Sequence, residues 1–195
     1  MDQALDAALQ LFWARGYDGT SLSQLRDAMG LSSASFYGAF GSKEQLFGLV
    51  LDHYAEGYGR VLAPLGDTAL APRDAVEAAL RNSARMQTDS AHPAGCLVAL
   101  SNSTCVPPDS TVYEVVQARR SADRARFAAC IRRGVEQGDL DPRTDVDALA
   151  TAFHAALLGI STLARDGITG PALEAAITGV MGAWDAAARR SARAA

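Results

Sequence analysis

Few side chains of this 195-residue chain have the types and spacing that catalysis or metal binding requires. The sequence contains no glycine-rich phosphate loop, no GxSxG and no HExxH, and none of its three histidines is paired with carboxylates at a useful spacing. The spacing of His92, Cys96 and Cys105 matches no usual metal site. We therefore expect no enzymatic activity, no cofactor and no metal ion.

The residues between 21 and 40 have a spacing that suits DNA binding. Ser21, with Gln24 three residues later, forms a capping box that begins a short helix, and Gly30 ends this helix. Ser32 can cap a second short helix. In a helix-turn-helix, the second of two such helices enters the major groove. Short helices joined by a tight turn also occur in proteins that bind no DNA, so the spacing alone leaves both interpretations open.

Hydrophobic side chains recur at helical spacing along most of the chain, and alternation typical of strands is absent. The first helix ends at Arg15, and a fourth helix begins at Lys43 and continues until Pro64 ends it. Further helices are predicted over 72–88, 96–102, 110–138, 145–166 and 171–190. We expect an all-α fold.

The charge of the chain opposes a role in DNA binding. The net charge is −4, and residues 1–60 carry four cationic and seven acidic side chains. Affinity for DNA comes largely from cationic contacts to phosphates, although hydroxyls, backbone N–H groups and helix N-termini also bind phosphates. The chain has no apolar run near the roughly 18 residues of a membrane span, no signal sequence and no CxxC pair. These features predict a cytoplasmic protein with reduced thiols.

Three motifs follow one another at fixed spacing near the N-terminus. They are Thr20-Ser21-Leu22, Met29-Gly30-Leu31-Ser32 and the run FYGAFGSKEQLF over residues 36–47. This sequence resembles the tetracycline-repressor (TetR) family, whose pattern is T-T/S, then G-V/L-S, then L/F-Y-x-x-F-x-S-K-E-x-L. The resemblance covers about the first 50 residues. It implies a three-helix N-terminal helix-turn-helix domain, residues 1–45, and a larger helical bundle for ligand binding and dimerisation, residues 46–195. It also implies a dimeric repressor that binds a palindromic double-stranded DNA operator and is released by a small molecule.

The resemblance also assigns roles to individual residues. Tyr37 and Lys43 correspond to residues that contact the phosphate backbone, and Ser33 begins the helix that faces the groove. The expected DNA-binding residues are Thr20, Ser21, Gln24, Arg26, Ser33, Ala34, Ser35, Tyr37, Gly38 and Lys43. Each has an alternative role: Tyr37 as a surface tyrosine, for example, and Lys43 as a solvated residue at a helix start. Gly38 and Ala39 stand where the family often has larger aromatic or histidine residues.

The expected ligand-binding residues are side chains with polar character inside apolar helices. They are Met86, His92, Cys96, Asn102, Cys105, Tyr113, Phe127, Phe153 and His154. For each of them, an ordinary core or surface position is the alternative. Cys96 and Cys105 have the spacing for a thiol switch, but cysteine is also a common inert core residue.

The last two predicted helices are rich in alanine and glycine, and a stripe with Gly159 and Trp184 suits close packing against a second copy. We expect a homodimer with a four-helix bundle across a two-fold axis; packing within one chain is the alternative. We also expect effector binding to swing the fourth helix, from Lys43 to Leu62, and so to change the separation of the two recognition helices. The competing hypothesis is a helical ligand-binding or interaction protein without sequence-specific DNA binding.

Overall fold

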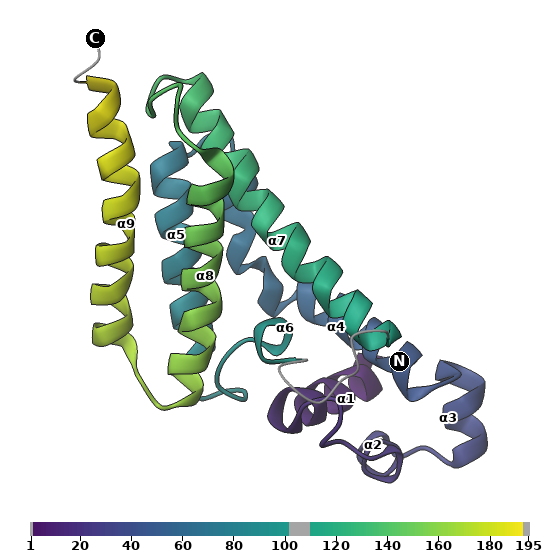
Figure 1. Ribbon diagram of the computed structural model, residues 1–195. Helices are drawn as coiled ribbons and strands as arrows, with labels where there is room; N and C mark the ends of the chain where they lie inside the picture. The colour runs from purple at the N-terminus through teal and green to yellow at the C-terminus, as the bar shows by residue number, and fades with distance from the viewer. Residues whose placement is uncertain (1, 102–109, 193–195) are drawn as a thin grey trace. The chain divides into compact units, whose positions relative to one another are not determined.

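The computed structural model describes residues 2–101 and 110–192, with side chains up to residue 188. Throughout this part of the chain the regular structure is helical, which confirms the predicted all-α class (Figure 1). The elements are α1 Asp2–Arg15, α2 Leu22–Met29, α3 Ser33–Phe40, α4 Lys43–Glu56, a 3₁₀ helix η1 Tyr58–Gly66, α5 Pro72–Gln87, α6 Leu97–Leu100, α7 Thr111–Glu136, α8 Val146–Arg165 and α9 Gly170–Ala192.

The chain forms two compact units. The first unit contains residues 1–60 and 89–120, and the second contains 61–88 and 121–195. Helix α7 begins in the first unit and ends in the second. The predicted boundary between residues 45 and 46 divides the chain by function, and it stays a prediction.

The core of the first unit is built around α1, which packs against α2 and α4. Helix α1 buries Phe12 and Trp13 on one face, as its helical spacing predicts. The Phe12 ring meets the Phe47 ring of α4 edge-on, with centroids 5.0 Å apart. Aromatic pairs of this geometry stabilise a core by about 0.5–1.5 kcal/mol beyond the burial of their area. Helices α1 and α4 therefore form the rigid part of the unit against which α2 and α3 pack.

The prediction that one helix continues from Lys43 to Pro64 is wrong. Helix α4 ends at Glu56, where the backbone of Gly57 leaves helical geometry with φ −102° and ψ −96°. The chain then continues as η1, and Pro64 lies inside this 3₁₀ helix instead of ending a longer α-helix. Gly57 and Gly59 explain the break, because each glycine costs about 1 kcal/mol in a helix relative to alanine.

Helices α5, α8 and α9 lie side by side in the second unit (Figure 1), and α5 packs against both of the others. Ion pairs fix α5 antiparallel to α9. Arg73, at the start of α5, pairs with Asp185 near the end of α9 at 2.8 Å, and Arg81 pairs with Glu174 near its beginning. Glu77 bridges the two arginines, so the five charged side chains form one continuous ladder.

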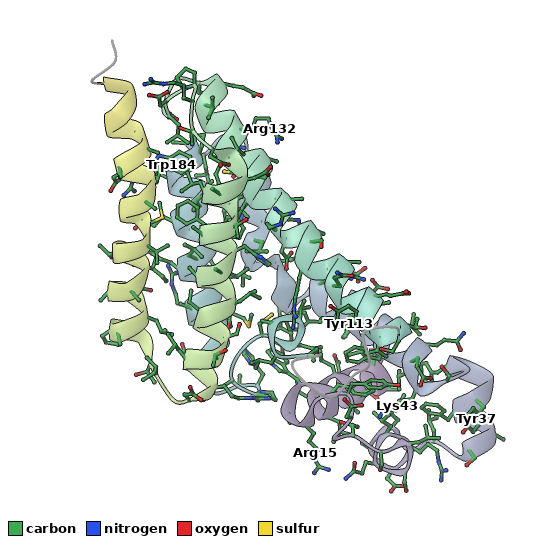
Figure 2. All side chains as sticks on the ribbon, in the orientation of Figure 1. Arg15, Tyr37, Lys43, Tyr113, Arg132 and Trp184 are labelled. Carbon is green, nitrogen blue, oxygen red and sulfur yellow. The ribbon has the colours of Figure 1, made fainter. Side chains whose placement is uncertain are left out.

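Trp184 has a different position from the predicted one. Its side chain is 2% exposed and packs between α9 and its neighbours (Figure 2). A Cβ atom placed on Gly134 would lie 2.8 Å from the Trp184 ring, so glycine leaves the space for this indole. Trp184 therefore belongs to the core of its own chain, which corrects its assignment to the dimerisation stripe, whereas Gly159 is exposed.

Helix α8 is long and apolar enough to cross a membrane by length and composition alone. Its most apolar 18-residue window has a mean hydropathy of 1.5, and 28% of that window is buried. Polar residues such as Asp147 and His154 interrupt this helix, so it contains no unbroken apolar run of that length. One helix of this kind does not identify a membrane protein, because core helices of soluble proteins pass the same test of length and composition.

Candidate nucleic-acid interface

Side-chain and glycine caps define the turn between α2 and α3. The Ser21 hydroxyl accepts from the Gln24 N–H at 3.2 Å, and the Gln24 side chain accepts from the Ser21 N–H at 2.9 Å. Gly30 ends α2 in the left-handed region, at φ 65°, a conformation that favours glycine. Ser32 then caps α3 by accepting from the Ser35 N–H at 3.1 Å. The sequence therefore specifies both the start of each helix and the turn that joins them.

Helix α3 has one buried and one exposed face. Phe36 is fully buried and Phe40 is 5% exposed, and their rings lie 5.7 Å apart. Ser33, Ala34 and Ser35 are all exposed. The α3 backbone is thus fixed by two buried phenylalanines, while the three small side chains of its first turn remain exposed to a partner.

Tyr37 is the most exposed large hydrophobic side chain among the described residues, at 53% (Figure 2). Its ring meets the edge of the buried Phe36 ring at 5.7 Å, which holds the tyrosine at the surface. The neighbouring Gly38 is also exposed, and a Cβ placed on it would have no atom within 4 Å. The surface next to Tyr37 therefore lets another molecule approach the backbone closely.

Lys43 lies at the first residue of α4, over the ring of Tyr17, with Nζ 4.0 Å from the ring centroid. Burial lowers the pKa of the Lys43 ammonium, and the nearby Asp18 and Glu44 partly offset this effect. The Tyr17 hydroxyl donates to Glu44 at 2.8 Å, and burial together with Glu44 raises the pKa of this phenol. The Tyr17 ring therefore positions the Lys43 ammonium at the N-terminus of α4.

The structure gives Thr20 a different role from the predicted phosphate contact. Its side chain is fully buried, and its hydroxyl donates to the Gly16 carbonyl at 2.7 Å. The hydroxyl is therefore unavailable to a phosphate and instead fixes the turn between α1 and α2. The side chain of Gln24 is engaged in the capping box. Arg26 is half-buried, and its Nε has no hydrogen-bond partner among the described residues.

Comparisons with known proteins identify this arrangement. Residues 4–50 match the model of bacterial regulatory proteins of the tetR family, and residues 72–180 match the tetracyclin repressor-like C-terminal domain. The HTH-type transcriptional repressor ComR of Escherichia coli K12 is 32% identical over 171 residues, 85% of this chain and 80% of ComR. The chain belongs to the tetR family. It is a DNA-binding transcriptional regulator and not an enzyme.

Two further relatives agree with this assignment. The HTH-type transcriptional repressor BdcR of Escherichia coli K12 is 36% identical over 100 residues, half of this chain and 49% of BdcR. A solved structure of the TetR family regulator CifR, a cysteine mutant complexed with 26-base-pair operator DNA, is 37% identical. It covers 94% of this chain and 96% of its own, with a TM-score of 0.87.

The expected effector-binding residues are divided between the two units. His92, Cys96 and Tyr113 belong to the first unit, and all three are half-buried. Met86, Phe127, Phe153 and His154 belong to the second. Phe127 and Phe153 are fully buried and stack on each other, with centroids 6.3 Å apart, so they form part of the hydrophobic core. Asn102 and Cys105 lie outside the described residues.

His92 and Cys96 both contact the helices of the first unit. The His92 ring stacks on Trp13 of α1 at 4.4 Å, and the Trp13 indole donates to the Gly95 carbonyl at 3.0 Å. The Cys96 thiol accepts from the Tyr54 hydroxyl of α4 at 3.2 Å. Among the described residues, no group of three His, Cys, Asp or Glu side chains is arranged to hold a metal ion.

Sequence reasoning missed two buried polar residues, Ser83 and Gln87 of α5, each 1% exposed. They lie four residues apart on the same helix face as Ala79, Leu80 and Ala84, which are buried. Two polar residues at helical spacing within an apolar stripe were the signal that could have identified them.

Proposed function

We propose that this protein represses transcription by binding a palindromic operator as a dimer, with one α3 helix in the major groove of each half-site. The observation that supports this proposal is the exposed row Ser33, Ala34 and Ser35 on a helix that Phe36 and Phe40 fix from behind. Serine hydroxyls bond to several base edges, and an alanine methyl packs on the methyl group of thymine. The relatives ComR and BdcR are named as repressors, and CifR was solved with operator DNA.

We place the phosphate contacts around this helix. Tyr37 lies on this helix and Lys43 follows it at the first residue of α4, and Ser21 and the exposed backbone of Gly38 contribute neutral groups. Gln24 and Arg26 on α2 remain candidate contacts, whereas Thr20 contributes only through the turn that its hydroxyl holds. This set contains only two cations, so we expect an affinity that depends less on salt than is usual for a DNA-binding protein.

The proposed dimer forms through α8 and α9. Both helices expose small residues: Ala148, Ala152, Ala155, Gly159, Ala172, Ala175, Ala176, Gly179, Ala183 and Ala186. Small side chains let two helices approach closely, and the limited burial of α8 within one chain leaves apolar surface for a second copy. A two-fold dimer would present two α3 helices to half-sites about 34–36 Å, or a multiple of that distance, apart.

We propose that a small molecule releases the operator by displacing α4, with its corrected bounds Lys43–Glu56. Residues 92–96 contact α1 through Trp13 and α4 through Tyr54, so a movement of this segment reaches both helices. Arg120 of α7 donates to the carbonyls of Val98 and Ala99, which ties α6 to α7 within the same unit. Such a shift requires that the effector bind the two conformations with different affinities.

A thiol switch remains a narrower version of this proposal. The Cys96 sulfur accepts a hydrogen bond from the Tyr54 hydroxyl of α4, and oxidation of this thiol would disturb that bond. Its predicted partner, Cys105, lies outside the described residues. Cys130 is buried, and burial raises the pKa of its thiol, which makes it unreactive.

The functional division at residues 45 and 46 belongs to the same proposal. Residues 1–45 contain the DNA-contacting helices, and residues 46–195 contain the dimer surface and the effector site. We further propose that the protein acts in the cytoplasm, where its DNA is accessible.

Binding to the DNA upstream of the chain's own gene tests the proposed function. Fluorescence anisotropy would compare the parent with Tyr37→Ala and with Leu49→Ala, which removes another exposed side chain of the first unit. We expect Tyr37→Ala to weaken binding about tenfold and Leu49→Ala to leave it unchanged. The acidic N-terminal region favours the alternative, a helical ligand-binding or interaction protein without sequence-specific DNA binding. Equal, non-specific binding by all three proteins would support that alternative.

A further inference from the structure

The end of α5 contains a buried amide with an unused hydrogen-bond acceptor. Ser83 and Gln87 are each 1% exposed, and the Gln87 side-chain nitrogen donates to the Ser83 hydroxyl. The Gln87 Oε1 atom is buried and has no hydrogen-bond partner among the described residues. Buried polar atoms are almost always hydrogen-bonded, because leaving one unpaired carries the full cost of its desolvation. This oxygen therefore calls for an explanation.

The surroundings of Gln87 restrict what can pair with it. The buried face of α5 is otherwise apolar, and Ala79, Leu80 and Ala84 belong to one core cluster with Phe127 and Phe153. In the described part of the second unit, Asp141 is the one buried charged side chain, and Arg143 already engages it. A charged ligand would lose its hydration without gaining a counter-charge. The pairing group is therefore neutral.

We propose that Gln87 is the polar anchor of the effector site. Its Oε1 accepts a hydrogen bond from a hydroxyl or N–H of a neutral and otherwise apolar effector, and Ser83 holds the amide in place. This inference rests on the proposed function, because it names the chemistry of the molecule that releases the operator. It also explains why a glutamine lies on the apolar face of α5, where a leucine would continue the apolar stripe.

The position of Gln87 in the chain connects it to the DNA-binding unit. Gln87 is the last residue of α5, and Thr88 caps the helix. Residues 89–101, which follow directly, belong to the first unit, where His92 stacks on Trp13 and Cys96 bonds to Tyr54. A molecule that binds Gln87 therefore contacts the last residue of α5, directly before residues 89–101.

A matched pair of small probes tests the proposed anchor in the full-length protein. Phenol carries a hydroxyl donor, and anisole has a similar shape without it. Apparent dissociation constants for each would be measured from the dependence of the urea unfolding midpoint on probe concentration. The variants are Gln87→Leu, which removes the acceptor at similar volume, and Gln137→Leu, which makes the same change at an exposed position.

We expect the parent and Gln137→Leu to bind phenol roughly five- to tenfold more tightly than anisole, as one added hydrogen bond implies. In Gln87→Leu this preference should vanish. The effects on stability oppose each other, because the substitution removes both the unpaired buried oxygen and the hydrogen bond from the amide nitrogen to Ser83. Equal binding of the two probes by the parent, or a preference that survives in Gln87→Leu, would overturn the proposal. Operator binding without probe is measured separately, so its absence would refute the proposed function and leave the probe result to decide on Gln87.

Discussion

The hydroxyl groups near α3 divide into those that hold the fold and those that face solvent. Thr20 bonds inward to Gly16, and Ser21 and Ser32 cap the two helices. Ser33 is exposed at the first residue of α3. The sequence predicts the caps, because capping depends on residues three positions apart. It could not predict the direction of the Thr20 hydroxyl, which depends on the path of the chain at Gly16.

This division predicts that substitutions of two neighbouring serines affect different properties of the protein. Ser32→Ala should lower the free energy of unfolding by about 1 kcal/mol, because it removes the cap of α3. Ser33→Ala should leave stability unchanged and weaken operator binding roughly fivefold, because it removes one contact to a base edge. Urea unfolding and fluorescence anisotropy separate the two effects. Unchanged DNA binding in Ser33→Ala would place this residue outside the groove.

The Glu44 carboxylate predicts a small dependence of stability on pH. Its own backbone N–H, followed by the hydroxyls of Tyr17 and Ser42, lowers the pKa of this carboxyl below its usual value. A lowered pKa stabilises the fold above the unfolded-state pKa of about 4.3, and this contribution is lost as the pH falls through the folded-state value.

Glu44→Gln should therefore reduce stability at pH 7 by no more than about 0.5 kcal/mol, because Glu44 is exposed. The difference from the parent should disappear as the pH falls below the lowered folded-state pKa of Glu44, where both side chains are neutral. Urea unfolding at several pH values measures this difference, with Glu56→Gln at the end of α4 as the matched control. A constant difference at all pH values would contradict the assignment.

At the scale of the elements, the helices follow the sequence closely except where spacing alone is ambiguous. The period of apolar residues predicts α5, α7, α8 and α9 to within a few residues. It does not predict the end of α4, because Tyr58 and Val61 continue the period past Gly57 into η1. It also places Trp184 on the correct helix but cannot tell which neighbour the indole packs against. That choice depends on Gly134, fifty residues earlier in the chain.

The contact between α7 and α9 predicts the effect of one methyl group. Gly134→Ala should destabilise the protein by about 1–3 kcal/mol, because its Cβ would lie 2.8 Å from the rigid Trp184 ring. The same substitution at Gly48 of α4 meets no atom within 4 Å and should stabilise the fold by about 0.5–1 kcal/mol. Thermal unfolding of both variants measures the difference. Unchanged stability in the Gly134→Ala variant would show that α9 can shift to accept the methyl group.

At the scale of the whole molecule, the exposed small residues of α8 and α9 require a second copy in our proposal. Ala152→Glu should separate the dimer, because it buries a charge without a partner at the interface. Ala129→Glu makes the same change on the exposed face of α7 and should leave the dimer intact. Sedimentation measures the mass of both. A dimeric Ala152→Glu protein would move the interface elsewhere.

The claim that most depends on the whole assembly is that two α3 helices enter successive major grooves of one operator. Hydroxyl-radical footprinting of the bound upstream DNA tests it most directly. We predict two protected regions related by a dyad, with centres about one helical turn or a multiple of it apart, and two chains per site. A single protected region, or protection without two-fold symmetry, would contradict the account.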